Sequence, residues 1–192
     1  MADMAMKYDG ENMNDESKLK PGFLLGPTAE FPVSPIFAIE TGLLFSSKGF
    51  KIDEKETYMD ETMEWKSKLN LLYLDLPITL KGKINVGDKT NLYVAAGPYM
   101  GYGLSGKVKA EYTYDGQTEK DEEDLKFGSN ENEDDLKRLD YGLTFGAGVE
   151  RGHFQFGVNY SLGLANLAVS SDDEYKINNK VMNVSVTYRF IQ

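Results

Sequence analysis

The sequence contains few of the residue types that catalyse reactions or ligate metals. It has no cysteine and a single histidine, His153, which excludes thiol nucleophiles, sulfur-ligated metals and multi-histidine zinc sites. His153 stands between Gly152 and Phe154 at an expected turn, without the serine and aspartate pattern of a nucleophile and its base. We therefore expect no catalytic residue, no cofactor and no metal site, and predict that the protein is not an enzyme.

Two acidic runs and one glycine-rich run could in principle bind ions. The acidic runs, at residues 121–124 and 131–135, lack the ligand spacing of an EF-hand loop and are typical of a solvated loop. The glycine-rich run, residues 101–106, could bind phosphate only with a helix after it, and no helix is predicted there. Neither run predicts a ligand site.

Several charged residues stand alone among small residues on one side of strand-like segments. They are Glu30, Glu40, Asp75, Lys81, Asp140, Glu150 and Arg189. A pair of carboxylates could act as the two acids of a glycosidase. In a narrow barrel, a buried ion network that includes Lys81 and Arg189 is the commoner arrangement. We predict such a network in the barrel lumen.

Strands have to position these side chains, because apolar residues recur at every second position and not with a helical period. The alternating segments are residues 23–31, 37–46, 72–81, 92–101, 140–150, 154–163 and 181–190, with a short one at 2–7. The pattern predicts an all-β chain of about eight strands whose first strand is short or truncated. We expect one domain over residues 1–192.

The connections between these segments alternate between long and short. The long ones cover about residues 7–21, 49–67, 105–139 and 165–180. Most of the net charge of −10 is on these connections, with −5 on residues 105–139. The alternation of long and short connections is typical of an up-and-down antiparallel barrel in an outer membrane, which has short periplasmic turns and longer outer loops. The negative charge also argues against nucleic acid as a partner.

The two faces of the strands differ in a way that favours a membrane barrel. A soluble barrel would carry long polar groups outside, whereas the polar face here is mostly Gly, Ala, Thr, Ser and Asn. We therefore expect the apolar face to contact lipid, at positions that include Leu72, Leu74, Leu76, Phe145, Phe156 and Val184. The alternative is a soluble lipocalin-like barrel that binds an apolar small ligand, with Leu72 to Leu80 pointing inward.

Several motifs resemble those of the porin-like outer membrane protein beta-barrel domain family. They are NLLYLDLPITLK at residues 70–81, AGPY at 96–99, FGAGVE at 145–150, NYSLGL at 159–164 and YRF at 188–190. The resemblance covers residues 22–190 and implies an eight-stranded barrel. Tyr188 and Phe190 resemble the C-terminal aromatic signal that the barrel-insertion machinery reads. The glycine-rich first strand usual in the family is not present in this sequence.

These observations predict a small barrel with a plugged polar lumen and acidic extracellular loops, in the outer membrane of a Gram-negative bacterium. Its expected role is structural, adhesive or in surface recognition, and not that of a wide diffusion pore. The expected partners are outer-membrane lipid, the barrel-insertion machinery and an extracellular ligand or protein. We expect a monomer, and a mature or trimmed chain, since no signal peptide opens the sequence.

Overall fold

The computed structural model describes residues 2–8, 11–12, 17–18, 20–58, 61–114, 117–130, 133–169 and 175–190. Its regular elements are all β-strands, so the all-β prediction is confirmed. The strands are β1 (Ala2–Tyr8), β2 (Glu11–Asn12), β3 (Ser17–Lys18), β4 (Leu24–Leu25), β5 (Thr28–Pro32), β6 (Phe37–Gly42), β7 (Leu44–Lys48), β8 (Lys51–Tyr58), β9 (Glu61–Gly87), β10 (Thr90–Tyr114), β11 (Gln117–Leu125), β12 (Leu139–Arg151), β13 (Phe154–Gly163) and β14 (Tyr175–Tyr188). The described residues include no helix that is long and apolar enough to cross a membrane.

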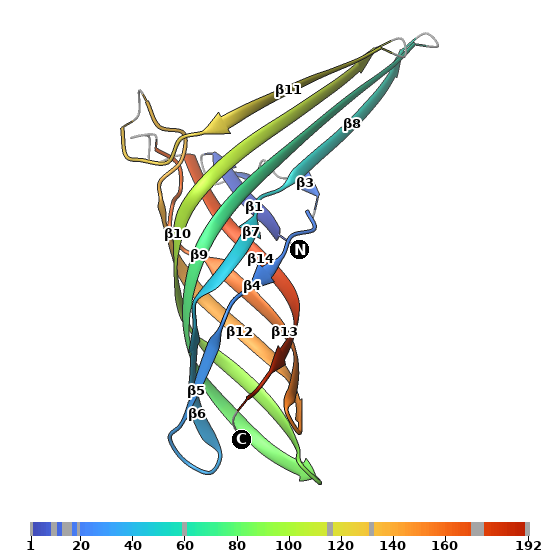
Figure 1. Ribbon diagram of the computed structural model, residues 1–192. Coiled ribbons are helices and arrows are strands. Elements are labelled where there is room, and N and C mark those ends of the chain that lie inside the picture. Colours follow the sequence, from blue (N-terminus) through green and yellow to red (C-terminus); the bar gives the residue numbers. More distant parts are fainter. Residues whose placement is uncertain are drawn as a thin grey trace.

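The strands form one antiparallel sheet that curves around a central axis (Figure 1). Its order is β2-β1-β14-β13-β12-β10-β9-β6-β5, with β7 and β8 also beside β9, and β11 beside β10. Short strands continue one another, so that β3, β4 and β5 lie along one edge of the sheet. The up-and-down order predicted from the sequence is therefore present.

The sheet is not closed. In its upper part β14 pairs with β1, from Ala2 opposite Val181 to Tyr8 opposite Tyr175. Below Val181, the described residues give β14 no paired strand on the side away from β13, and β5 pairs only with β6. A strand count of about eight therefore remains a prediction.

Tight turns join the strands at one end, which we call the short-turn end. Asp88 and Lys89 link β9 to β10, and Lys89 has a φ of 52°. Gly152 and His153 link β12 to β13, and Gly152 has a φ of 57°, a conformation that glycine adopts at little cost. At the turn between β5 and β6, the Ser34 hydroxyl accepts a hydrogen bond from the Phe37 amide at 3.0 Å.

At the other end, two predicted loops were wrong. Residues 49–67 and 105–139 are mostly strand, because β8 with β9 and β10 with β11 form hairpins. These hairpins pair through β9 and β10, from Lys68 opposite Lys109 to Met63 opposite Tyr114. The resulting arm, β8-β9-β10-β11, projects far beyond the barrel (Figure 1). Of the other two predicted loops, residues 165–180 include the start of β14, residues 7–21 include β2 and β3, and parts of both lie outside the described residues.

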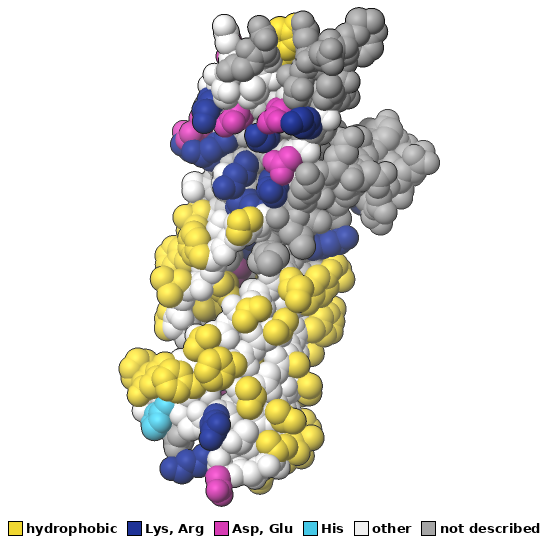
Figure 2. Space-filling model, turned by 90° about the vertical axis from the view of Figure 1, so that its right-hand side faces the viewer, with side chains coloured by type: hydrophobic (Ala, Val, Ile, Leu, Met, Phe, Trp, Pro, Cys, Tyr) yellow, Lys and Arg dark blue, Asp and Glu magenta, His cyan; other side chains and the backbone are white. Residues whose placement is uncertain are grey.

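Large apolar side chains cover the outside of the barrel in a broad band (Figure 2). Val184 is 79% exposed and Phe145 46%. Leu76 and Phe156 are also exposed, while Leu72 and Leu74 are partly buried. A contiguous apolar exterior of this kind suits hydrocarbon, since a water-soluble monomer rarely exposes such a patch.

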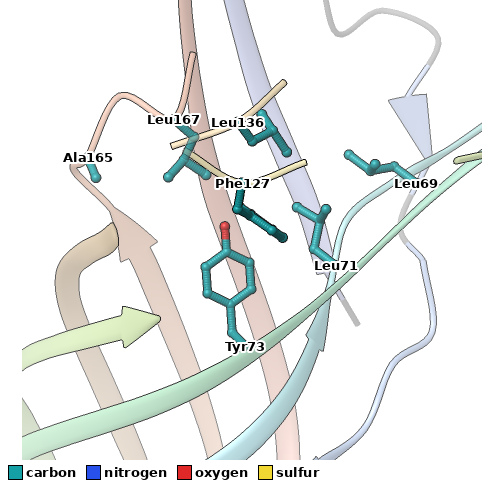
Figure 3. Packing of buried hydrophobic residues seen from close by; sticks show 7 residues of the cluster. All are labelled: Leu69, Leu71, Tyr73, Phe127, Leu136, Ala165 and Leu167. Carbon is teal, nitrogen blue, oxygen red and sulfur yellow. The ribbon is translucent and has the colours of Figure 1, made fainter. Parts of the chain in front are cut away.

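The principal buried apolar cluster lies at the end that carries the arm. Its members are Leu69, Leu71, Tyr73, Phe127, Leu136, Ala165 and Leu167 (Figure 3). Irregular segments after β11 and β13 supply part of this cluster, and the amide of Lys137 bonds the carbonyl of Leu167 at 2.8 Å. The rings of Tyr73 and Phe127 meet edge to face with centroids 5.8 Å apart. We call this cluster the apolar cap.

Candidate functional site

Lys81 is the centre of an ionic cluster inside the barrel, near the short-turn end. β9 places its side chain on the inner face, where it has no exposed surface. The Lys81 ammonium donates to Glu30 at 2.9 Å, to Gln155 at 2.8 Å, to Glu150 at 3.3 Å, and also to Glu40. Four different strands supply these partners. One lysine therefore connects opposite parts of the wall.

Lys83 and Arg189 complete the Lys81 cluster. Lys83 forms ion pairs with Glu30 and, at 3.1 Å, with Glu150. A guanidinium nitrogen of Arg189 lies 3.0 Å from Glu150, and another donates to the carbonyl of Gly152 at 3.1 Å. Three cations thus face the carboxylates of Glu30, Glu40 and Glu150. The formal charge balances, which is what lets these groups remain ionised away from bulk water.

A second cluster, around Lys48, lies closer to the apolar cap. The Lys48 ammonium is 2.8 Å from Asp75 and 3.0 Å from Asp140. Asp75 also accepts a hydrogen bond from Ser46 at 2.5 Å, while Asp140 accepts from Asn179 at 2.9 Å and from Tyr99 at 3.3 Å. The ammonium of Lys48 further lies over the rings of Tyr73 and Tyr99, at 4.5 and 5.0 Å from their centroids. Both carboxylates are therefore held by one lysine and several neutral donors.

A chamber of about 450 Å³ separates the two clusters. Hydroxyl, amide and small side chains line it, including Thr79, Thr144, Asn159, Ser161 and Asn183. The chamber also reaches Phe23 and Leu25 on one side and Val184 and Val186 on the other, where the sheet is open.

Glycines in the wall make room for the ring of Tyr93. A Cβ atom on Gly157 would lie 2.2 Å from the Tyr93 hydroxyl, and one on Gly148 would lie 2.7 Å from it. The Tyr93 hydroxyl accepts a hydrogen bond from Gln155 at 3.3 Å, and its ring lies 4.6 Å from the Lys81 ammonium. The small residues on the polar face therefore leave space for large polar side chains.

The structure groups the charged residues proposed from the sequence into two sets. Glu30, Glu40, Lys81, Glu150 and Arg189 meet in the Lys81 cluster. Asp75 and Asp140 meet apart from them. Sequence reasoning missed the partner of this second set, Lys48, and also Lys83 and Gln155. Lys48 and Lys83 each continue the inner-face alternation by one step, two residues beyond Ser46 and Lys81.

Aromatic side chains gather at the short-turn end near the last strand. Tyr188 contacts Phe154 and Phe190 edge to face, with centroids 5.4 and 5.1 Å apart. The ring of His153 stacks on Tyr188 at 5.7 Å, and Phe190 is 87% exposed. Exposed rings at this level suit the membrane interface. The structure thus places His153 within an aromatic group, where it stacks on Tyr188.

One face of the arm carries a dense set of cross-strand ion pairs. Glu122 of β11 lies 2.5 Å from Lys107 and 2.8 Å from Lys109, both on β10. Hydrogen bonds from Lys107 and then Lys109 lower the pKa of Glu122 to about 2. On β9, hydrogen bonds from Lys66 and Lys55 lower the pKa of Glu64. These pairs join strands that pack against no apolar core at this level.

Comparison with known proteins agrees with this geometry. A model of the outer membrane protein beta-barrel domain family matches residues 4–169. The chain belongs to that family, and is an outer-membrane β-barrel protein. No curated protein matches it. Among solved structures, the chain is similar to the attachment invasion locus protein Ail of Yersinia pestis, with 19% identity, coverage of 98% of this chain and 93% of that one, and a TM-score of 0.38.

Proposed function

We propose that this protein is an outer-membrane barrel with a plugged, non-conducting lumen that displays a recognition arm at the cell surface. The observation that carries the proposal is the position of Lys81, which has no exposed surface and bonds four partners from different parts of the wall. A wide pore needs a continuous water path, and this lysine stands across that path with its counter-ions.

Two further obstacles support a plugged lumen. Lys48 holds Asp75 and Asp140 together above the chamber. The apolar cap lies above Lys48, where Leu71, Tyr73 and Leu167 are almost fully buried. An ion that moved along the axis would have to displace both ionic clusters and then cross this apolar layer, which is unfavourable for a charge.

The arm supports a role in surface recognition. Outer-membrane barrels keep short turns on the periplasmic side and long connections outside, so β8 to β11 would project from the cell. In the proposed eight-stranded arrangement, β1, β3 to β5, β6 to β8, β9, β10, β12, β13 and β14 each supply one pass through the wall. The protein would act as a monomer and without catalysis, with lipid, the insertion machinery and an extracellular ligand or protein as its partners.

The soluble alternative fits the structure poorly. A lipocalin-like binder would bury its leucines and expose its charges. Here Asp140 and Glu150 have no exposed surface, whereas Ile78 and Leu80 are about half exposed, at 49% and 54%. We therefore do not propose that the lumen binds an apolar ligand.

Recording of current across a planar bilayer tests the plug. Purified protein should insert without a sustained open level, because the lumen has no continuous water path. A matched variant in which Lys48 and Lys81 are both replaced by alanine, if it still inserts, should conduct more. A sustained open level in the unmodified protein would contradict the proposal.

Attachment of intact cells tests the arm. Cells that display the protein should bind their target surface, and cells with residues 53–66 and 109–122 each replaced by a short glycine-serine turn should not. Equal attachment by both would show that recognition lies elsewhere.

A further inference from the structure

The two faces of the arm differ sharply in charge. Strand register places Lys66, Lys68, Lys107, Lys109 and Lys120 on one face, together with their carboxylate partners. Side chains alternate along a strand, so the residues between them face the other way. On that other face, the described arm residues of β9 (61–69), β10 (106–114) and β11 (117–125) include no lysine or arginine.

The face without lysine carries a strip of exposed aromatic rings. Trp65 of β9 is directly opposite Tyr112 of β10, and these side chains are 44% and 43% exposed. Tyr114 continues the strip and is 39% exposed. These residues belong to the arm, which projects beyond the barrel (Figure 1). Tryptophan and tyrosine in such positions are typical of contact surfaces.

A row of carboxylates borders this strip. Glu119, Asp121 and Glu123 alternate along β11, opposite Tyr112, Ala110 and Val108. Successive side chains on one face of a strand are about 7 Å apart, so these groups repel one another. Within the described part of the chain none of the three has an ion-pair partner, whereas Glu122, on the opposite face of the same strand, has two. The row therefore lacks cations of its own.

We propose that this aromatic and acidic face binds an extended, arginine- or lysine-rich segment of another polypeptide. A cation at every second position of such a segment would match the spacing of Glu119, Asp121 and Glu123. Cations between the carboxylates and the rings would gain both an ion pair and a cation–π contact with Trp65 or Tyr112. This inference rests on the proposed recognition role and names the chemistry of the partner.

The test uses the full chain in detergent and a blocked peptide of five Arg-Thr repeats. Trp65 is the only tryptophan, so its fluorescence reports contact at this face directly. We expect saturable binding with a change in Trp65 emission, which weakens as salt is added. A peptide of five Glu-Thr repeats should not bind. Failure of the arginine peptide to bind, or binding that leaves Trp65 emission unchanged, would overturn the inference.

Two matched variants distinguish binding at this face from non-specific electrostatic attraction to the arm. The first, Glu119→Gln with Asp121→Asn and Glu123→Gln, should raise the Kd at least tenfold. The second, Glu111→Gln with Glu122→Gln and Asp124→Asn, removes the same charge from the opposite face and should change the Kd less than threefold. Equal weakening in both would contradict the inference. Circular dichroism of each variant checks that the strands persist, and Tyr112→Thr supplies an uncharged test of the same face with the same expected loss.

The peptide-binding experiment and the bilayer recording test two separate proposals, so one can be refuted while the other stands. A protein that conducts ions but binds the arginine peptide would refute only the plugged lumen. A protein that does not conduct and does not bind the peptide would refute only the partner assigned here.

Discussion

Lys81 and Glu150 meet at 3.3 Å with no exposed surface on either side chain, although β10 lies between their strands. The pair therefore reaches across the inner face of β10 and does not join neighbouring strands. Both residues have further partners, which makes the Lys81 cluster a network and not a single ion pair.

Replacement of Lys81 by methionine should lower the free energy of unfolding by about 3–5 kcal/mol, because buried carboxylates lose their common partner. Unfolding by urea in lipid vesicles measures this change. Lys126→Met, at an exposed position, is the control and should change little. Equal midpoints for the two variants would mean that Lys81 does not stabilise the fold.

Arg189→Leu should cost less than the Lys81 substitution, about 1–3 kcal/mol. Glu150 would keep Lys83 at 3.1 Å and Lys81 at 3.3 Å after Arg189 is lost. The same unfolding measurement ranks the two variants. A larger loss for Arg189→Leu would show that the Lys83 contact does not compensate.

Gly157→Ala should destabilise the barrel by about 1–3 kcal/mol through overpacking against Tyr93. The new methyl group would lie 2.2 Å from the Tyr93 hydroxyl but 3.5 Å from the adjoining ring carbon. Tyr93→Phe removes the hydroxyl, so the double variant should be more stable than the sum of the single changes predicts. Simple additivity would refute the contact.

The Glu122 carboxyl group should titrate at about pH 2, because Lys107 and Lys109 bond its ionised form. Since its pKa is lowered, the contribution of Glu122 to the stability of the hairpin is present above its ordinary pKa of about 4.5 and is lost as the pH falls toward 2. Carbon NMR of the side chain follows the titration. Lys107→Gln should raise the pKa, and Lys126→Gln should leave it unchanged.

Labelling of single cysteines on intact cells should distinguish the two ends of the barrel. The chain has no cysteine of its own. An impermeant maleimide should label Lys120→Cys, on the arm, and spare Lys89→Cys, in a short turn. The reverse result would invert the proposed orientation.

The sequence predicted strands best where their two faces meet different surroundings. From Leu72 to Leu80, one face meets the polar lumen and the other the outside, so apolar and polar residues alternate. Residues 51–66 and 105–125 lack that contrast, because water reaches both faces of the arm and ion pairs replace hydrophobic burial. A hydrophobicity pattern consequently indicated loops there, although strands are present.

The sequence predicts part of the two ionic clusters in the lumen. Charge on an otherwise small and polar face indicated Glu40, Lys81 and Glu150. Lys48 is not among the predicted residues because the alternating segment in the sequence ends at residue 46, one step before it. The apolar cap could not be foreseen, since Phe127, Leu136 and Leu167 come from irregular segments in which no period relates neighbours in sequence to neighbours in space.

The open edge affects the stability of the sheet in a bilayer. Because each successive pair is antiparallel, β5 and β14 run in the same direction. In hydrocarbon, every amide or carbonyl without a partner costs several kcal/mol. An extended segment inserted between the two edges, in line with β1, would run antiparallel to both and could satisfy the main chain from Met182 to Tyr188. A lipid environment therefore favours the binding of any polypeptide strand that pairs with both edges and completes the hydrogen bonds between them.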